Sequence, residues 1–186
     1  MASQRASKLT ELEGTVLGLI ATKGPCTPYA VRREFVDSPS PFWSGSAGAI
    51  YPLIARLARR GLVRVAGGTG DGRAGKLYAL TPAGRRLLSR WIREPLSPVA
   101  IGIPPDPLRN RVQFIGVLGE EEGSAVLADA LAKLEAHLQE LITCADKKKA
   151  EGKILEYIVD RGACQLTLAR LGWLRETIAF LARSND

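Results

Sequence analysis

The chain has 186 residues, of which 46% are hydrophobic and 24% are charged. This composition is that of a globular protein, and it excludes the disordered and collagen-like classes. No apolar run approaches the roughly 20 residues that a bilayer-spanning helix needs, and the first residues lack the apolar block of a signal peptide. We therefore expect a cytoplasmic protein without a membrane partner.

Few side chains are suited to catalysis or metal binding. The three cysteines, Cys26, Cys144 and Cys164, are odd in number and widely spaced, which argues against a disulfide framework and against a zinc site. The sequence predicts no cofactor, no metal and no enzymatic activity. An enzyme with Cys144 or Cys164 as nucleophile is an alternative, but His137 is the only histidine that could act as its base.

The charge is distributed unevenly along the chain. The net charge is +7, and residues 1–95 hold 15 basic and 6 acidic side chains, whereas residues 96–186 hold 11 basic and 13 acidic ones. A basic half joined to a nearly neutral half is typical of a protein in which one domain binds a polyanion such as nucleic acid.

A proline-rich stretch separates the two halves. Residues 94–107 contain five of the eleven prolines, and such a stretch disfavours both helix and central strand. We expect a first domain over residues 1–94, a semi-rigid connector over residues 95–107 and a helical domain over residues 108–186.

Helix-start signals recur in the first domain. Thr10 and Glu13 form a capping box that opens a helix ending at Gly24, and Thr27-Pro28 opens a second helix through about Val36. A third helix is expected from a cap at Ser44 or Ser46 to about Arg60, with a bend at Pro52.

Two short strands and a fourth helix follow the third helix. The pattern of residues 62–66 and 76–80 predicts two short strands, and the glycine-rich segment between them predicts a hairpin tip. Thr81-Pro82 then opens a helix through about Arg93. Helix, helix, helix, hairpin, helix is the order of a winged helix-turn-helix, in which Arg73 and Lys76 of the hairpin can reach DNA phosphates.

The second half is helical throughout. We expect a short helix over residues 108–118, a long helix from Glu120 to Lys149 and a last helix over about residues 153–182, whose apolar side chains lie on more than one face. The long helix carries apolar residues at heptad spacing, and these are Leu127, Leu131, Leu134, Leu138, Leu141 and Ala145. Two such helices cannot bury all this apolar surface alone, so we expect a homodimer through the first five of these leucines.

Several segments of the first domain together resemble PadR-type transcriptional regulators. They are LTELEGTVLGLI, PYAVRREF, FWSGSAGAIYPLIARLARRGLV and KLYALTPAGRRLL. The resemblance implies a mainly α protein with a small β-hairpin, namely a winged helix-turn-helix followed by a C-terminal antiparallel helical dimerisation domain. It also implies a repressor that binds a palindromic operator in double-stranded DNA. The chain departs from the family pattern at Ala47 and Ala49, where members often carry polar side chains, so direct base reading by the third helix should be limited.

The candidate site residues follow from the pattern and the resemblance together. Those expected to contact DNA are Ser44, Ser46, Tyr51, Arg56, Arg73 and Lys76. Family members also bind small apolar molecules between domains, which makes Phe114 and Trp173 candidates for an effector pocket that takes an aromatic ligand. A fully packed core without a cavity is the alternative at this position.

Two other protein classes share parts of this pattern. A winged helix that binds protein would not need the basic excess of residues 1–95. A MarR-like regulator usually places dimerisation helices on both sides of the winged domain, whereas only about nine residues precede the first helix here.

Overall fold

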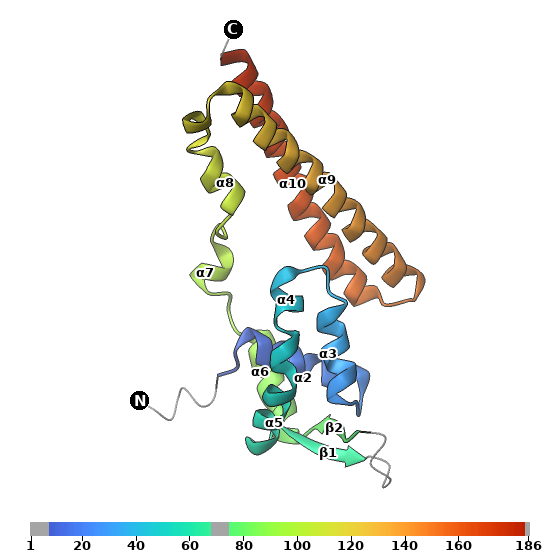
Figure 1. Cartoon of the computed structure of the whole chain (residues 1–186). Helices are drawn as coiled ribbons and strands as arrows, with labels where there is room; N and C mark the ends of the chain where they lie inside the picture. The colour runs from blue at the N-terminus through green and yellow to red at the C-terminus, as the bar shows by residue number, and fades with distance from the viewer. Residues whose placement is uncertain (1–7, 68–74, 185–186) are drawn as a thin grey trace. The chain divides into compact units, whose positions relative to one another are not determined.

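The computed structural model describes residues 8–67 and 75–184. The chain divides into two compact units, residues 1–101 and residues 102–186, and the division falls within the proline-rich stretch. Each unit is described by itself below (Figure 1).

The N-terminal unit has the element order of a winged helix-turn-helix, as the sequence predicts. Among the described residues, four helices, of which α4 is a short one of five residues, are followed by a hairpin and then by the helices α6 and α7. The elements are α2 (Glu11–Lys23), α3 (Pro28–Val36), α4 (Pro41–Gly45), the 3-10 turn η1 (Ala47–Ala49), α5 (Ile50–Arg59), β1 (Val63–Gly67), β2 (Leu77–Leu80), α6 (Pro82–Arg93) and α7 (Pro98–Ile101).

Threonine caps start three of these helices, which confirms the predicted boundaries. The Thr10 hydroxyl accepts a hydrogen bond from the Glu13 N–H at 3.2 Å, and the Glu13 carboxylate completes the capping box by accepting from the Thr10 N–H at 3.1 Å. Thr27 and Thr81 cap α3 and α6 in the same way, each followed by a proline at the first helical position. A side-chain oxygen at this position satisfies an N–H that the helix itself leaves unpaired.

The predicted start of the third helix is wrong. A separate short helix, α4, begins after Ser40-Pro41, and a 3-10 turn connects it to α5. Neither Ser44 nor Ser46 caps α5, whose N-cap residue is Ala49. Pro52 therefore lies in the first turn of α5, where the helix does not need an N–H donor. The reason for expecting a bend at this proline no longer applies.

The wing is an antiparallel pair of strands. Val63 pairs with Leu80 and Val65 with Tyr78, and a bulge follows Val65. The segment between α2 and α3 extends this sheet, because Cys26 and Tyr78 exchange backbone hydrogen bonds of 3.1 and 2.8 Å. The hairpin is thereby attached to the helical part of the unit.

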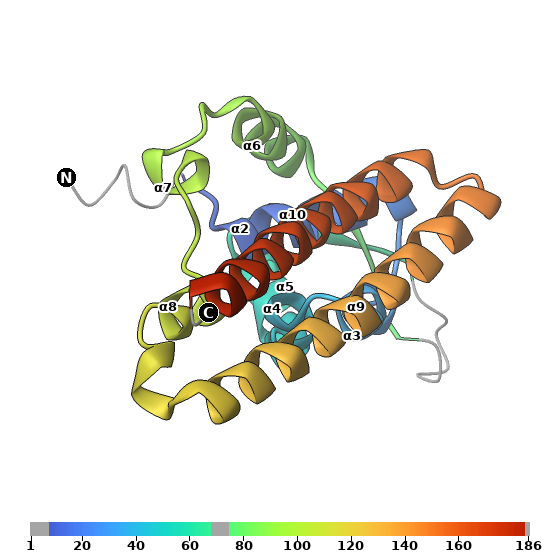
Figure 2. The same ribbon diagram turned by 90° about the horizontal axis from the view of Figure 1, so that it is seen from above.

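The core of the N-terminal unit lies between α2, α3, α5 and α6, and α2 lies between α6 and α5 (Figure 2). Close packing of α6 depends on two glycines. A Cβ at Gly14 would meet the Trp91 ring at 2.4 Å, and a Cβ at Gly84 would meet the Leu62 carbonyl oxygen at 2.0 Å. Trp91 of α6 thus packs directly on the backbone of α2.

The C-terminal unit is built on a hairpin of two long antiparallel helices. It comprises α8 (Pro107–Val112), the 3-10 turn η2 (Ile115–Leu118), α9 (Glu120–Ala150) and α10 (Ile154–Ser184). The single helix predicted over residues 108–118 is broken at Gln113–Phe114 into α8 and η2. The connector also differs from the prediction, since Ser97-Pro98 starts the four-residue helix α7 within it.

The heptad leucines of α9 are buried within one chain. Leu138 and Leu141 are buried in one cluster with Cys164 and Leu171 of α10, and Leu131 and Leu134 pack against this cluster. Leu127 is buried as well. The heptad pattern of α9 thus describes the packing of the hairpin itself, and these side chains do not form a free apolar stripe.

Ion pairs connect the elements of this unit. Lys148 Nζ lies 2.7 Å from Asp160 Oδ2 near the turn between α9 and α10, and Arg175 pairs with Glu135 further along the hairpin.

Among the described residues, no helix is both long enough and apolar enough to cross a membrane.

The Gly14–Trp91 contact predicts opposite effects for two similar substitutions in α2. Gly14→Ala should lower the free energy of unfolding by about 1–3 kcal/mol, because the Trp91 ring must move. Gly18→Ala adds the same methyl group where no atom lies within 4 Å, and it should raise stability by up to about 1 kcal/mol through helix propensity. Urea unfolding of both variants measures this, and equal effects would contradict the packing described here.

Candidate nucleic-acid interface and effector site

The outer face of α5 is exposed. Tyr51, Pro52, Ala55 and Arg59 follow one another at helical spacing and are all exposed, whereas Ile50, Leu53, Ile54 and Leu57 are buried. Tyr51 is 50% exposed. The winged domain thus holds α5 by its apolar face and leaves one narrow side available for a groove of DNA.

The two serines predicted to contact DNA bond to their own helix. The Ser44 hydroxyl donates to the Ser40 carbonyl at 3.2 Å, and the Ser46 hydroxyl donates to the Phe42 carbonyl at 2.8 Å. Each hydroxyl still has acceptor capacity. The N–H groups of Ala49 and Ile50 are bonded within the 3-10 turn, so the start of α5 has fewer free donors for a phosphate than the sequence suggested.

Buried Glu13 ties the start of α2 to the end of α5. Its Oε1 lies 2.8 Å from Arg60 and 3.3 Å from Arg56, and its side chain is only 6% exposed. Arg56 is therefore paired within the domain, although half of its side chain is exposed. Arg59 lies between these two arginines in sequence and has no ion pair or side-chain hydrogen bond among the described residues.

The same contacts determine the charge state of Glu13. Burial acts to raise the pKa of this carboxyl group, but the hydrogen bond from the Thr10 N–H and the neighbouring charges of Arg60 and Arg56 outweigh it. The pKa of Glu13 is therefore lowered. The carboxylate is ionised at neutral pH and keeps both arginines in place.

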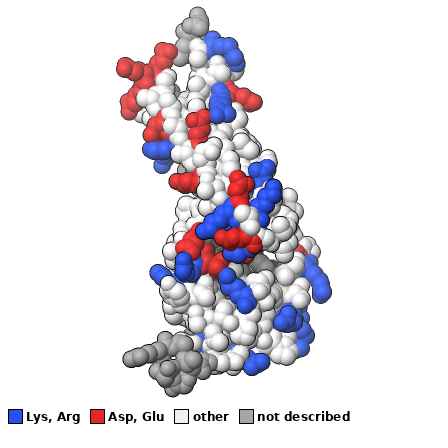
Figure 3. Space-filling model, turned by 90° about the vertical axis from the view of Figure 1, so that its right-hand side faces the viewer, with Lys and Arg blue, Asp and Glu red and all other residues white. Residues whose placement is uncertain are grey.

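The wing adds exposed basic side chains. Lys76 at the start of β2 and Arg64 on β1 are exposed and have no ion pair among the described residues. Arg73, the other wing residue predicted to contact DNA, lies outside the described residues. On the face shown in Figure 3, Lys and Arg are spread over the N-terminal unit, and acidic side chains are rare towards its lower edge.

A hollow in the C-terminal unit contains one of the two residues predicted for an effector pocket. Trp173 lines it together with Thr177 and Phe180 of α10, and Val112 and Ile115 form its other side. Its volume is about 460 Å³. Phe114 is 64% exposed and is not among the lining residues. Arg183 and Glu176 add charged groups at the rim.

The position of α8 beside this hollow depends on one ion pair. Arg170 of α10 lies 2.9 Å from both carboxylate oxygens of Asp106, which also accepts hydrogen bonds from the N–H groups of Leu108 and Arg109. Burial acts to raise the pKa of Asp106, but the bonds from Arg170 and the helix N–H groups outweigh it and lower this pKa.

An exposed apolar stripe runs along α10, on a different side from the face that packs on α9. Buried residues of α10 follow a heptad pattern, and they are Asp160, Cys164, Thr167, Leu171 and Leu174. A second heptad pattern is exposed, and it comprises Leu155, Val159, Gly162, Leu166 and Ala169. The sequence showed that the last helix is apolar on several faces, but only the contacts of α9 identify which stripe is free.

No group of three or more His, Cys, Asp or Glu side chains suited to a metal ion occurs in the described part of the chain.

Glu13 makes stability depend on pH in a predictable direction. Because its pKa is lowered by folding, its contribution is present at neutral pH and is lost as the pH falls below about 4.5, through the folded-state pKa. Glu13→Gln should lower the free energy of unfolding at pH 7 by about 1–3 kcal/mol. It should also flatten the loss of stability between pH 5 and 3, as followed by urea unfolding across this range. A variant with wild-type stability at pH 7 would contradict the role given to this carboxylate.

The comparisons with known proteins agree with this geometry. Residues 16–90 match the transcriptional regulator PadR-like family. Over 180 residues the chain is 26% identical to the negative transcriptional regulator PadR of Bacillus subtilis (strain 168), covering 91% of this chain and 97% of that protein. The crystal structure of Bacillus subtilis PadR in complex with operator DNA matches with a TM-score of 0.78 at 25% identity, over 92% of this chain and 99% of that one.

A second crystal structure, of Bacillus subtilis PadR in complex with p-coumaric acid, matches with a TM-score of 0.76 at 24% identity, over 92% of this chain and 95% of that one. The fold match thus extends beyond the winged domain into the helical unit. The family match over residues 16–90 and the similarity to these relatives over most of the chain's length relate this chain to the PadR-like transcriptional regulators.

Proposed function

We propose that this protein is a homodimeric repressor that binds a palindromic operator through its winged domains and releases it when a small aromatic molecule binds. The exposed face of α5 carries the proposal, because it leaves Tyr51 and Arg59 available beside a narrow helix surface. The regulator is proposed to act in the cytoplasm and to have no enzymatic activity of its own.

Contacts of α5 with DNA would be made mainly to the backbone. Arg59, which makes no ion pair with any described residue, supplies a guanidinium group for a phosphate, and the Tyr51 hydroxyl supplies a second donor. The exposed helix face has no Asn or Gln for a bidentate contact to a base, and the small side chains Ala49 and Ala55 suit the methyl group of thymine. Sequence preference would then rest partly on DNA shape and on the wing.

Dimerisation would use the exposed stripe of α10. Leu155, Val159 and Leu166 are each more than 70% exposed, which is costly for a stripe of aliphatic side chains in water. Gly162 and Ala169 at the alternating positions allow a second helix to approach closely. A second copy of this chain is the proposed occupant, because a two-fold dimer presents two recognition helices to a palindrome.

Effector release would use the hollow beside Trp173. Bacillus subtilis PadR binds p-coumaric acid in one of its crystal structures, and we propose a planar aromatic acid as ligand here. Trp173 and Phe180 offer aromatic surface for its ring, and Arg183 offers a positive charge for its carboxylate. To release DNA, the ligand must favour one arrangement of the two winged domains over another.

Arg59→Ala is the direct test of the α5 surface. It should weaken binding to operator and non-operator duplexes alike, by about tenfold at low salt, and lower the slope of log affinity against log salt by about one. Fluorescence anisotropy at several salt concentrations measures both quantities. Lys133→Ala on α9 removes an exposed charge elsewhere and should change neither, and a wild-type slope in Arg59→Ala would place DNA on another surface.

Val159→Glu combined with Leu166→Glu tests the stripe. Both side chains are 71% exposed, so the variant should stay helical but sediment as a monomer, and it should bind operator DNA much more weakly. Leu138→Asp is the matched comparison, because it places a charge in the buried hairpin seam and should unfold the unit. A stable dimer of the double variant would show that the partner does not cover this stripe.

Calorimetric titration with p-coumarate tests the hollow. The wild-type dimer should bind it and lose operator affinity in parallel, whereas Trp173→Leu should remove binding without unfolding the protein. Binding that leaves operator affinity unchanged would contradict a switch, and no binding of this compound would contradict the proposed ligand class.

A further inference from the structure

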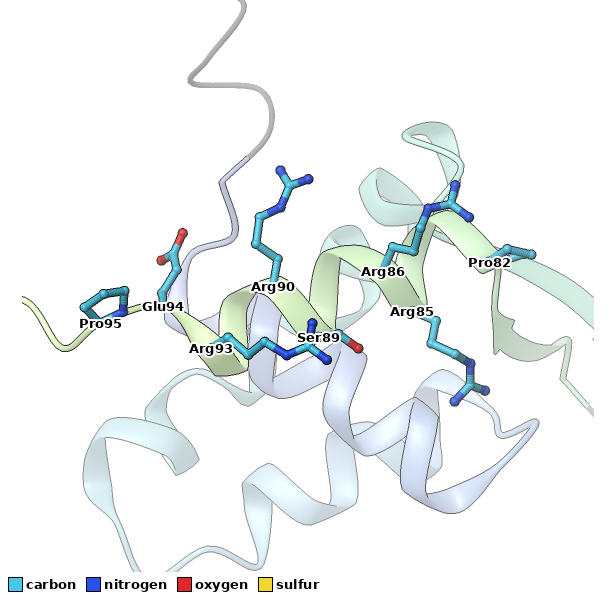
Figure 4. Close-up of a pocket in the computed structure, with 8 residues that line it drawn as sticks. All are labelled: Pro82, Arg85, Arg86, Ser89, Arg90, Arg93, Glu94 and Pro95. Atoms are coloured by element: carbon cyan, nitrogen blue, oxygen red, sulfur yellow. The ribbon is translucent and has the colours of Figure 1, made fainter.

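The outer face of α6 is a second basic surface. Arg85, Arg86, Arg90 and Arg93 are exposed on it, while Gly84 and Leu88 are buried and Leu87 and Trp91 pack against the core. No acidic residue occurs between Pro82 and Arg93. All eight residues around a shallow hollow at this surface come from α6 and the two positions after it (Figure 4).

These four arginines have no ion-pair partner among residues 8–67 and 75–184, in contrast to other arginines of the same unit. Arg33 pairs with Asp37, and Arg56 and Arg60 pair with Glu13. Within the part of the chain that the structure describes, the arginines of α6 make no ion pair or side-chain hydrogen bond. Glu94, the nearest acid in sequence, is held by Lys8 at 3.4 Å.

Helix stability does not account for this arrangement. Arg90 and Arg93 suit the negative end of the helix dipole, but Arg85 and Arg86 lie near the positive end, where cations are unfavourable. Arg86 and Arg90 also repel each other at i,i+4 spacing. The cost of gathering these charges is offset when an anion binds them.

The shape of the cluster favours an extended anion. Figure 4 shows the guanidinium groups of Arg86 and Arg90 on one side of α6 and that of Arg85 on the other, so they do not converge on one point. From residue 85 to residue 93 the helix rises about 12 Å. A strand of B-DNA carries one phosphate per about 3.4 Å of helix axis, so three or four phosphates match this length.

The α6 surface is separate from the α5 surface. Helix α2 packs against both helices and lies between them (Figure 2). A duplex bound on the outer face of α5 would therefore leave the arginines of α6 exposed. We infer that the α6 arginines bind the backbone of a second DNA duplex segment while the α5 surface occupies the operator. This inference rests on the proposed DNA binding.

A capture assay tests the bridging. Immobilised operator duplex is saturated with the full-length protein, washed, and offered a labelled 60-base-pair duplex without the operator. The wild type should capture the second duplex. Arg86→Ala with Arg90→Ala should bind the operator with unchanged affinity but capture the second duplex about 50-fold more weakly at 0.1 M salt, as expected for two lost phosphate contacts.

Two further variants serve as controls, one for the loss of charge elsewhere in the protein and one for the loss of charge on α6. Lys147→Ala with Lys149→Ala removes the same charge from the end of α9 and should capture like the wild type. Arg86→Lys with Arg90→Lys keeps the charge and should retain most of the capture. Circular dichroism confirms that each variant is folded.

Three outcomes would overturn the inference. Undiminished capture by the double alanine variant would show that α6 is not the second site. Loss of operator affinity by the same variant would place these arginines in the primary interface. Capture of single-stranded RNA but not of duplex DNA would assign the surface to another polyanion. Failure of the wild type to bind any operator would instead contradict the proposed function itself.

Discussion

The winged domain depends on one buried carboxylate. Glu13 completes the capping box at the start of α2 and accepts hydrogen bonds from Arg56 and Arg60 near the end of α5. A buried charge is tolerated only when its lone pairs are satisfied, so the three donors must stay where they are. The rotation of α5 about its axis is thereby set, with Arg56 and Arg60 turned towards Glu13 and Arg59 left facing outwards. The surface available to DNA follows from this pairing.

In the C-terminal unit, the two heptad faces of α10 have different surroundings. One face packs against α9 and is buried within the chain, and the other face is exposed. One face of α10 is therefore used inside the chain, and the other remains exposed for the partner proposed above. If a second copy covers that exposed face, substitutions on it change the oligomeric state without touching the contacts between α9 and α10.

Local chemistry explains what the sequence could predict. Three helices begin with a threonine cap that is followed by a glutamate or a proline, and these threonines are Thr10, Thr27 and Thr81. Such local signals are enough to predict the three helix starts and the order of elements in the winged domain. The predicted start of the third helix is wrong because Ser44 and Ser46 look like caps, whereas α5 begins after Ala49 and a separate short helix, α4, begins after Ser40-Pro41. Trp43 of α4 packs edge-on against Phe35 of α3, a tertiary contact without a local signal.

Long-range partners explain what could not be predicted. A heptad of leucines looks the same whether it packs against α10 of its own chain or against a second chain, and only the contacts decide. The apolar periodicity places Arg56, Arg59 and Arg60 on one helix. Which of them is paired inside the domain depends on Glu13, which lies 43 residues before Arg56. Trp173 of the last helix lines the hollow, and Val112 and Ile115 line it from two elements, α8 and η2, whose separation by a break in the chain has no signal in the apolar pattern.

Two copies of this winged domain, held by the C-terminal units, are proposed to bind one operator. Hydroxyl-radical footprinting of the purified protein on the DNA upstream of its own gene tests this most directly. Two protected half-sites related by a dyad are expected, with centres about 34 Å apart or a multiple of that distance. A single protected segment without a symmetry-related partner, or uniform protection of all the DNA, would contradict it.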